Sequence, residues 1–241
     1  MTGTHEPEIV LHADADAVAE ALATRLTARL AEIQADARVP QLALTGGRIA
    51  TKAYQRLAAE GAASAVDWSR VDLWWGDERF VASDDDDRND LGTLQLLRDA
   101  LPLDEPRIHQ MPASDGGADL DAAAAGYAAE LGSTVFDVCL LGMGPDGHVA
   151  SIFPEHPSFS TPGRVIAVRN SPKPPPDRIS VTLEVINASR QVWFLVSGRD
   201  KAAAAKQALE GGQPPVPAAE VSGVERTVWL LDEEAAADLS T

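Results

Sequence analysis

The chain has 241 residues, of which 45% are hydrophobic and 24% are charged, and its net charge is −17. This length and composition predict a single globular α/β domain over residues 1–241 that folds without disulfides. The excess of acidic residues excludes non-specific binding to nucleic acid and disfavours anionic membranes, because both depend on a surplus of Lys and Arg.

Cysteine content and the N-terminus suggest where the protein resides. Cys139 is the only cysteine, so the chain can form neither an internal disulfide nor a Cys-based metal site. Residues 1–9 lack the basic and apolar regions of a signal peptide. No apolar run approaches the roughly 20 residues that span a membrane. We therefore expect a cytoplasmic protein without membrane association.

Apolar runs alternate with helical patterns along the whole chain. The clearest helical pattern has Asp14 or Asp16 as its N-cap, followed by apolar residues at helical spacing. In chain order the pattern predicts a strand at 7–13, a helix at 14–37, a strand at 40–47, a helix at 48–60, a strand at 71–80, an acidic loop at 83–90, a helix from there to about residue 100, a strand at 107–111, a helix at 120–131, strands at 135–144, 164–168, 178–186 and 190–198, a helix at 200–212 and a strand at 225–231.

The strands are continuously apolar, which predicts a mostly parallel sheet covered by helices on both faces. Ligands of such sheets bind at the carboxyl ends of the strands. Four loops that follow predicted strands carry glycine or charge, and they are the first places to look for a site: residues 45–48, 76–79, 142–148 and 197–201.

The third of these loops contains a G-x-G-x-x-G pattern in Gly142, Gly144 and Gly147. A dinucleotide site would also need a following helix and an acidic residue about 20 positions later. Pro154 and Pro157 interrupt the expected helix, and no acidic residue stands at the required distance. A dinucleotide site is therefore disfavoured.

The same loop can instead present a histidine. His148 follows the glycines, and a histidine titrates near neutrality, so it can act as both base and acid in one cycle. Asp146 could orient its imidazole. The residues alone leave a second interpretation open, in which His148 caps a turn at the start of a short helix.

The loop "LTGGR" offers a candidate anion site. Gly46 and Gly47 expose backbone N–H groups at a helix N-terminus, Thr45 adds a hydroxyl and Arg48 adds a charge. An ordinary turn between a strand and a helix would look similar. Lys201 begins a helix, where a cation opposes the helix dipole, and a bound anion would explain its position.

Other polar segments admit a simpler interpretation. Asp77, Glu78 and Arg79 follow two tryptophans and form either a solvated loop or part of a site. The acidic run at 84–87 reads as solvated surface rather than a metal site. No G-x-S-x-G motif surrounds Ser151, which argues against a serine nucleophile.

Five motifs occur in order: "GDERFV", "DDRN", "LLGMGPDGHVASIFP", "KPPPDRIS" and "SGRDKA". Together they resemble the 6-phosphogluconolactonase family. The resemblance runs from about residue 40 to 205, and "GMGPDGHVASIFP" is its most specific part. The loop "LTGGR" departs from the commoner Ser-Gly-Gly-Ser-Thr form, because Arg48 stands where a hydroxyl residue is usual.

The resemblance implies a modified Rossmann-like three-layer α/β sandwich with a mostly parallel sheet, shared with sugar-phosphate isomerases. It implies a carboxylic ester hydrolase that converts 6-phospho-D-glucono-1,5-lactone to 6-phospho-D-gluconate in the oxidative pentose phosphate pathway. The implied partner is a small sugar phosphate lactone. No metal or organic cofactor is implied, and we expect a monomer or small homo-oligomer.

Roles for individual residues follow from the resemblance. His148 would be the base and then the acid, with Asp146 or Asp77 as its main partner. Asp77 and Arg79 would line the pocket. The phosphate would be held by residues of two loops and one strand: Thr45, Gly46, Gly47, Arg48, Arg178 and Lys201.

Two other functions are alternatives. An amino-sugar phosphate isomerase or deaminase shares the D-G-H loop, but typically has Asp-Glu-Tyr where this chain has Asp77, Glu78 and Arg79. A non-catalytic sugar-phosphate sensor would need a DNA-binding module, and the sheet is expected to begin within the first residues of this acidic chain.

Overall fold

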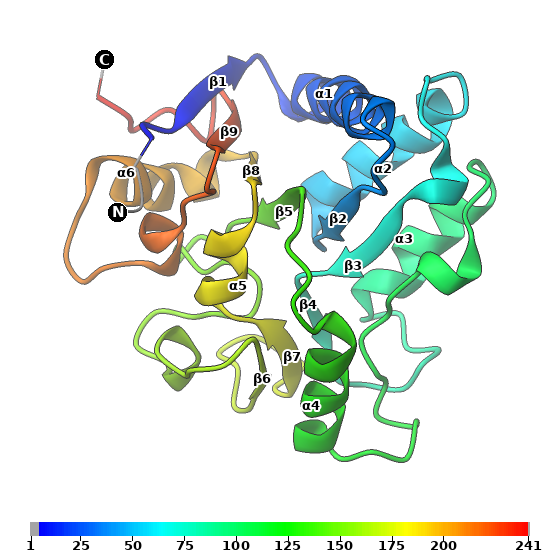
Figure 1. Cartoon of the computed structure of the whole chain (residues 1–241). Helices are drawn as coiled ribbons and strands as arrows, with labels where there is room; N and C mark the ends of the chain where they lie inside the picture. Colours follow the sequence, from blue (N-terminus) through cyan, green and yellow to red (C-terminus); the bar gives the residue numbers. More distant parts are fainter. Residues whose placement is uncertain (1–4, 241) are drawn as a thin grey trace.

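The protein is described by a computed structural model that covers residues 5–240. Residues 1–4, part of the segment tested above for a signal peptide, lie outside the described residues. A parallel six-stranded sheet forms the centre (Figure 1). Its strands, in spatial order, are β1 (Glu8–His12), β9 (Arg226–Asp232), β8 (Gln191–Val196), β5 (Val138–Gly142), β2 (Gln41–Leu44) and β3 (Asp72–Trp75).

A second, antiparallel sheet lies beside the first. It consists of β4 (Asp77–Arg79), β7 (Arg178–Val181) and β6 (Val165–Val168), in that order. Its buried residues Ile179 and Val181 belong to the same hydrophobic core as the central sheet. The sequence did not predict this second sheet.

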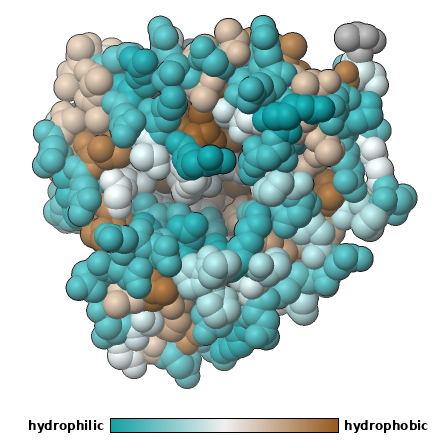
Figure 2. All heavy atoms as spheres, turned by 180° about the vertical axis from the view of Figure 1, so that it is seen from behind, coloured by the Kyte–Doolittle hydropathy of each residue, from teal (hydrophilic) through white to brown (hydrophobic). Residues whose placement is uncertain are grey.

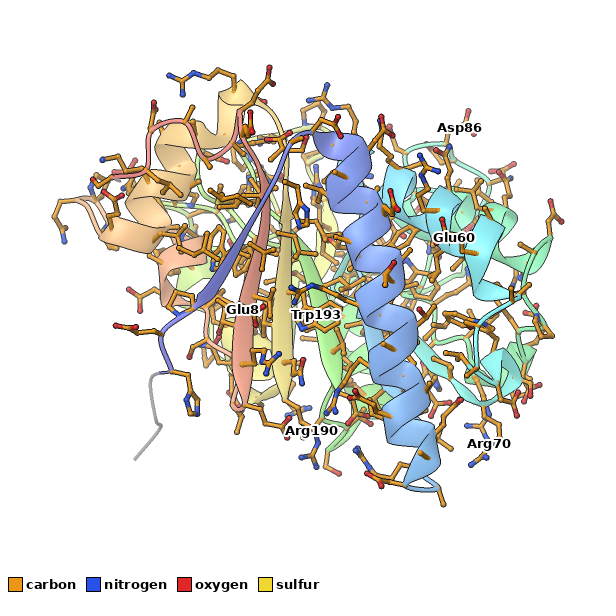
Figure 3. The ribbon with its side chains drawn as sticks, turned by 90° about the horizontal axis from the view of Figure 1, so that it is seen from above. Glu8, Glu60, Arg70, Asp86, Arg190 and Trp193 are labelled. Atoms are coloured by element: carbon orange, nitrogen blue, oxygen red, sulfur yellow. The ribbon has the colours of Figure 1, made fainter. Side chains whose placement is uncertain are left out.

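Helices cover the sheets from several sides. The α-helices of residues 5–240 are α1 (Ala15–Ala35), α2 (Arg48–Gly61), α3 (Asn89–Arg98), α4 (Leu120–Leu131), α5 (Leu183–Ala188) and α6 (Ala202–Glu210). Short 3₁₀ turns occur at Trp68–Arg70, Glu105–Arg107, Pro157–Phe159, Arg199–Lys201 and Pro217–Glu220. Helix α1 runs along one face of the central sheet, and α4 packs against the small sheet (Figures 1 and 3). This arrangement confirms the predicted α/β sandwich with a mostly parallel sheet.

The N-terminal helix follows the predicted pattern. The carboxylate of Asp14 accepts the N–H of Ala17, so Asp14 is the N-cap, while Asp16 pairs with Lys52. The apolar residues at helical spacing are all buried.

No helix between residues 5 and 240 combines the length and apolar character needed to cross a bilayer. One face of the molecule is hollowed near its centre, with mainly hydrophilic side chains around the hollow (Figure 2).

Two predicted strands are wrong in their extent because the chain changes direction within them. The run at 71–80 divides at Gly76, whose N–H bonds to β2 through Leu44 and whose carbonyl accepts the N–H of Val181 in β7. One residue thus joins the two sheets. The run at 178–186 ends as a strand at Val181, and Thr182 begins α5, because the apolar residues that follow continue at helical spacing.

The predicted strand at 107–111 is also wrong. A 3₁₀ turn ends at Arg107, and only an isolated bridge between Ile108 and Leu73 extends the sheet. Pro106 and Pro112 flank this stretch and cannot donate backbone hydrogen bonds, so a longer edge strand does not form.

The only two tyrosines of the chain hold the ends of two central strands. The hydroxyl of Tyr54 accepts the N–H of Thr45 and donates to its carbonyl, at 3.0 and 2.9 Å. Tyr127 makes the same pair of bonds to Trp75, at 3.0 and 3.2 Å. Both hydroxyls are buried, and burial raises the pKa of each above its ordinary value. Each ring therefore satisfies backbone groups at the point where a strand ends.

We predict that Tyr54→Phe lowers the free energy of unfolding by about 1–3 kcal/mol, because it leaves the buried backbone groups of Thr45 unpaired. Urea denaturation followed by tryptophan fluorescence measures this loss. Thr51→Val is the control: its hydroxyl bonds the Gly47 carbonyl at the surface, and its loss should cost less than about 0.5 kcal/mol. Equal stability of Tyr54→Phe and the wild type would contradict the role of the hydroxyl.

Candidate active site

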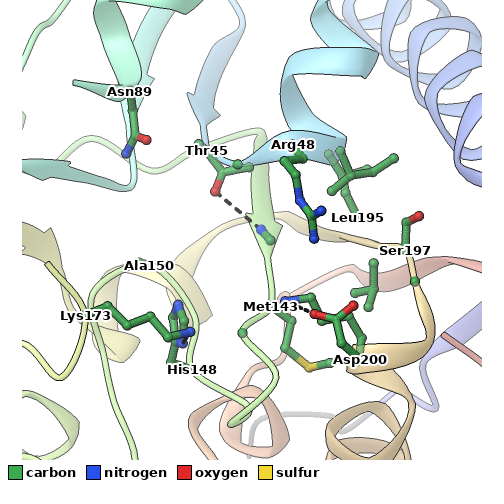
Figure 4. Close-up of a pocket in the computed structure, with 18 of the residues that line it drawn as sticks. Thr45, Arg48, Asn89, Met143, His148, Ala150, Lys173, Leu195, Ser197 and Asp200 are labelled. Carbon is green, nitrogen blue, oxygen red and sulfur yellow. Dashed lines mark hydrogen bonds and ion pairs between the residues drawn. The ribbon is translucent and has the colours of Figure 1, made fainter. Parts of the chain in front are cut away.

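A cavity of about 760 Å³ opens at the carboxyl ends of the central strands. All four loops singled out from the sequence contribute to its lining, and the close-up in Figure 4 shows side chains from three of them, at 45–48, 142–148 and 197–201, around it. The predicted site residues that line it are Thr45, Gly46, Gly47, Arg48, Asp77, Arg79, His148, Arg178 and Lys201. Asp146 is not among the lining residues and contacts the cavity through His148.

The glycine loop is built around His148. Its Nδ1 lies 2.6 Å from Oδ1 of Asp146, which identifies Asp146, rather than Asp77, as the carboxylate in contact with the imidazole. Phe153 packs against the ring at a centroid distance of 4.7 Å. A Cβ atom at Gly144 would lie 2.0 Å from Nδ1, so only glycine leaves room for the ring. No α-helix directly follows His148, because the next regular element is the 3₁₀ turn Pro157–Phe159, so neither a dinucleotide site nor a helix-capping histidine fits this loop.

The electrostatics of this pair favour an ionised carboxylate. Burial opposes the charge on Asp146, but the hydrogen bond to His148 and the charges of His148 and Lys173 outweigh it and lower the pKa of the carboxyl. With Asp146 facing Nδ1, the second ring nitrogen Nε2 has no hydrogen-bond partner among residues 5–240. The imidazole is thus oriented by one nitrogen and open at the other.

Asp77 lies on β4, lines the same cavity as His148 and is 6% exposed. Its Oδ2 accepts a hydrogen bond of 2.6 Å from the hydroxyl of Ser151, which is fully buried. The Ser151 hydroxyl is fully buried and is not among the residues that line the cavity, so a substrate there does not reach it. This agrees with the sequence argument against a serine nucleophile.

Arg79 is held by the start of α3. Its Nη1 donates to the carbonyl of Asp87 at 2.6 Å and to Oδ1 of Asn89 at 2.7 Å. The neighbouring Glu78 is buried, and its carboxylate accepts the backbone N–H groups of Arg79, Asn89 and Asp90. Glu78 thus ties β4 to the N-terminus of α3, and it is structural rather than a residue of the cavity.

Asn89 is a contact that the sequence analysis missed. Its Oδ1 accepts a hydrogen bond from Arg79, and its Nδ2 donates one to the carbonyl of Asp77 at 3.1 Å. A Cβ atom at Gly46 would lie 1.8 Å from its Oδ1. Asn89 therefore packs directly on the loop at residues 45–48 and links it to β4. The motif "DDRN" was the available signal, but its role depends on the sheet that the sequence did not predict.

The loop at residues 45–48 has the form of an anion site. Gly47 precedes α2 and no side chain caps the first turn of that helix, so its N–H groups are available. Arg48 is exposed and has no ion-pair partner among residues 5–240 (Figure 4). The Thr45 hydroxyl accepts the N–H of Gly142 at 3.3 Å. Across the cavity, Nζ of Lys201 lies 3.4 Å from Asp200.

Arg178 lies at the cavity, but most of its donors face the protein. Its Nε donates to the carbonyl of Pro175, and its Nη2 donates to those of Lys173 and Pro174, at 3.0–3.1 Å. Nη1 has no partner within the described chain. Arg178 thus shapes the loop at 173–175 and can offer at most one nitrogen to a ligand.

Lys173 is the second residue that the sequence analysis missed. Its Nζ lies 3.3 Å from Nδ1 of His148 and 3.5 Å from Oδ1 of Asp146 (Figure 4). It begins the motif "KPPPDRIS", in which the sequence analysis assigned a role only to Arg178. Lys173 and His148 are 25 positions apart in the sequence and adjacent in the fold.

Among residues 5–240, no group of three or more His, Cys, Asp or Glu side chains is arranged to hold a metal ion.

Several known proteins are similar to this chain over nearly its whole length. Residues 13–229 match the family described as glucosamine-6-phosphate isomerases/6-phosphogluconolactonase. The chain belongs to this family. It is 49% identical to the 6-phosphogluconolactonase of Streptomyces coelicolor, over 97% of this chain and 95% of that protein. It is 42% identical to the 6-phosphogluconolactonase of Mycobacterium tuberculosis, over 96% and 98%.

Solved structures of family members have the same fold. The 6-phosphogluconolactonase of Thermotoga maritima is 28% identical with a TM-score of 0.84, over 94% of this chain and 99% of that chain. A monomeric glucosamine-6-phosphate deaminase has a TM-score of 0.82, over 96% and 99%, at 20% identity. The latter likeness concerns the fold alone, so it does not favour the deaminase reaction.

We predict that Gly46→Ala lowers the free energy of unfolding by about 1–3 kcal/mol, because the new methyl group overlaps the Asn89 amide. The same substitution in an Asn89→Ala background should cost much less, since the three nearest atoms are then gone. Urea denaturation of the four proteins gives the coupling energy. Equal costs in both backgrounds would show that the two residues do not constrain each other.

Proposed function

We propose that this family member hydrolyses 6-phospho-D-glucono-1,5-lactone to 6-phospho-D-gluconate, the second step of the oxidative pentose phosphate pathway. The observation that carries the proposal is the pair of His148 and Asp146 at the wall of a cavity lined by basic side chains. The extent and identity of the match to proteins named 6-phosphogluconolactonase support it.

His148 is the proposed acid–base group. Nδ1–H donates to Asp146, which fixes the tautomer and leaves Nε2 as an acceptor. Nε2 takes a proton from a water molecule as that water attacks the lactone carbonyl carbon. The imidazolium then returns the proton to the ring oxygen as the ester bond breaks. Asp146 stabilises the imidazolium between the two steps.

The phosphate is proposed to bind at the start of α2. The free N–H groups of Gly47 and the first turn, with the Arg48 guanidinium, provide hydrogen bonds and charge. Thr45 and Gly46 shape this loop, Lys201 provides a second cation, and Nη1 of Arg178 can contribute one further donor. Binding the phosphate away from the reacting ester orients the carbonyl toward the attacking water.

Arg79 and Asp77 are proposed to act on the sugar end of the substrate. The hydrogen bonds of Arg79 to α3 hold its charge at the cavity, where it favours negative charge developing on the carbonyl oxygen. Asp77 accepts the Ser151 hydroxyl through Oδ2, which leaves its other oxygen for a sugar hydroxyl. No step of this mechanism requires a metal or an organic cofactor.

We further propose a cytoplasmic location and a monomer or small homo-oligomer. The only cysteine is a buried core residue, and burial raises the pKa of its thiol to about 12, as expected for an inert cysteine. Deamination of an amino-sugar phosphate is the second candidate reaction, because the family includes isomerases and the carboxylate of Asp77 faces the same cavity.

We predict that His148→Gln lowers kcat for 6-phosphogluconolactone by about 10²–10⁴-fold, because the acid–base group is lost. The decay of freshly generated lactone near pH 6.5, where spontaneous hydrolysis is slower, measures the rate. His109→Gln is the matched control, since that imidazole stacks on Trp74 outside the cavity and should keep wild-type kcat. Wild-type activity in His148→Gln would reject the mechanism, and an inactive wild type would direct attention to glucosamine 6-phosphate.

We predict that Arg48→Ser raises KM for the phosphorylated lactone by about tenfold with little change in kcat, because one charged contact is worth roughly 1–2 kcal/mol. Lys201→Met should have a similar effect. Kinetics with unphosphorylated gluconolactone provide the comparison, since that substrate should not distinguish these variants from wild type. Equal loss on both substrates would contradict a phosphate contact.

A further inference from the structure

We propose that Lys173 is a positioning residue that keeps His148 in its neutral form. Its ammonium offsets part of the negative charge that Asp146 places beside the imidazole. The inference rests on the proposed role of His148 and adds a third member to its pair with Asp146. None of the roles assigned above to the cavity residues requires a cation at this point.

The Lys173 ammonium lies beside Nδ1 of the imidazole, and not beside Nε2. Nζ of Lys173 lies 3.3 Å from His148 Nδ1 and 3.5 Å from Asp146 Oδ1, while Asp146 Oδ1 lies 2.6 Å from Nδ1. When Nδ1 carries the proton that it donates to Asp146, it has no lone pair for Lys173. The ammonium is then an electrostatic neighbour of the ring and a partner of the carboxylate.

This arrangement changes what Asp146 does to the imidazole. A carboxylate alone beside a histidine stabilises the imidazolium, whereas a base must be neutral before it can accept a proton from water. A lysine ammonium beside both groups offsets part of the carboxylate charge and repels the imidazolium. Asp146 then orients the ring while its tendency to protonate the ring is weakened.

The protein fixes Lys173 at this place through its backbone. The carbonyl of Lys173 accepts a hydrogen bond from Nη2 of Arg178, and the next two carbonyls accept from the same guanidinium. Arg178 is 5% exposed and belongs to β7, so the loop is attached to a rigid strand. The side chain of Lys173 therefore starts from a fixed point and lies beside His148 on the same side of the cavity (Figure 4).

Other charged groups also surround the cluster. Burial, Lys201 and Arg178 lower the pKa of the Lys173 ammonium, and Asp146 opposes them. The further charged side chains that line the cavity are Arg48, Lys52, Asp77, Arg79, Arg199, Asp200 and Glu234. None of these seven has a hydrogen bond or ion pair with His148, whereas Lys173 and Asp146 both contact its Nδ1.

The test is the titration of His148 in the free enzyme, followed by NMR of protein labelled with ¹⁵N-histidine. The His148→Gln variant assigns its signal among the five histidines. Removing the ammonium in Lys173→Met should raise the titration midpoint of His148 by about 0.5–1 pH unit. Lys173→Arg keeps the charge and should leave the midpoint near that of wild type.

Lys206→Met is the matched control. It removes the same charge from the chain, but Lys206 pairs with Glu210 on α6 and does not line the cavity, so the midpoint should not move. An unchanged midpoint in Lys173→Met would overturn the inference. So would a shift of equal size in Lys173→Arg.

The reaction provides a separate measurement. If His148 is the base, the acidic limb of kcat against pH should move with the titration, so that kcat of Lys173→Met on that limb falls by about three- to tenfold while its plateau at higher pH is retained. A residue that only bound substrate would raise KM at every pH and leave the limb in place. A shifted titration in a protein that does not hydrolyse the lactone would reject the proposed function and leave the inference about Lys173 standing.

Discussion

One residue, Gly76, bonds to both sheets, and the composition of the cavity depends on it. Its N–H completes the edge of the parallel sheet at Leu44, and its carbonyl receives the first hydrogen bond from β7. The chain therefore leaves one sheet and enters the other without a connecting loop. As a result, Arg79 on β4 stands directly opposite Arg178 on β7, beside the carboxyl ends of the parallel strands.

This juxtaposition explains how a chain with a net charge of −17 forms a strongly basic cavity. The cations come from segments that are distant in sequence, and most are held by backbone carbonyls or by carboxylates. Arg178 is fixed by loop carbonyls, and Arg79 is fixed by the start of α3. Because these cations converge on one concave site, negative ligands are attracted there although the chain as a whole is acidic. The cavity cations are Arg48, Lys52, Arg79, Lys173, Arg178, Arg199 and Lys201.

The sequence predicts features that depend on neighbours along the chain. His148 and Asp146 are two residues apart, so a tight turn suffices to bring them together, and the helical pattern of α1 is likewise local. Features that depend on the second sheet were missed. Asn89 acquires its role from β4, and Lys173 from the loop that β7 carries, and neither arrangement leaves a periodic signal. The division of the run at 71–80 was hidden because both halves are apolar or buried and no proline marks the break.

The tyrosine hydroxyl bonded to Thr45 has a consequence for how this loop can vary between relatives. Tyr54 lies in α2 itself, so its hydroxyl closes a ring formed by residues 45–54, which contains Gly46 and Gly47. The shape of that ring is set by backbone hydrogen bonds and by contact with Asn89, and no bond from the side chain at position 48 contributes to it. Position 48 is thus free to exchange a short hydroxyl for a long guanidinium without rebuilding the turn. The affinity and charge preference of the proposed anion site can therefore change by single substitutions while the backbone of the turn stays constant.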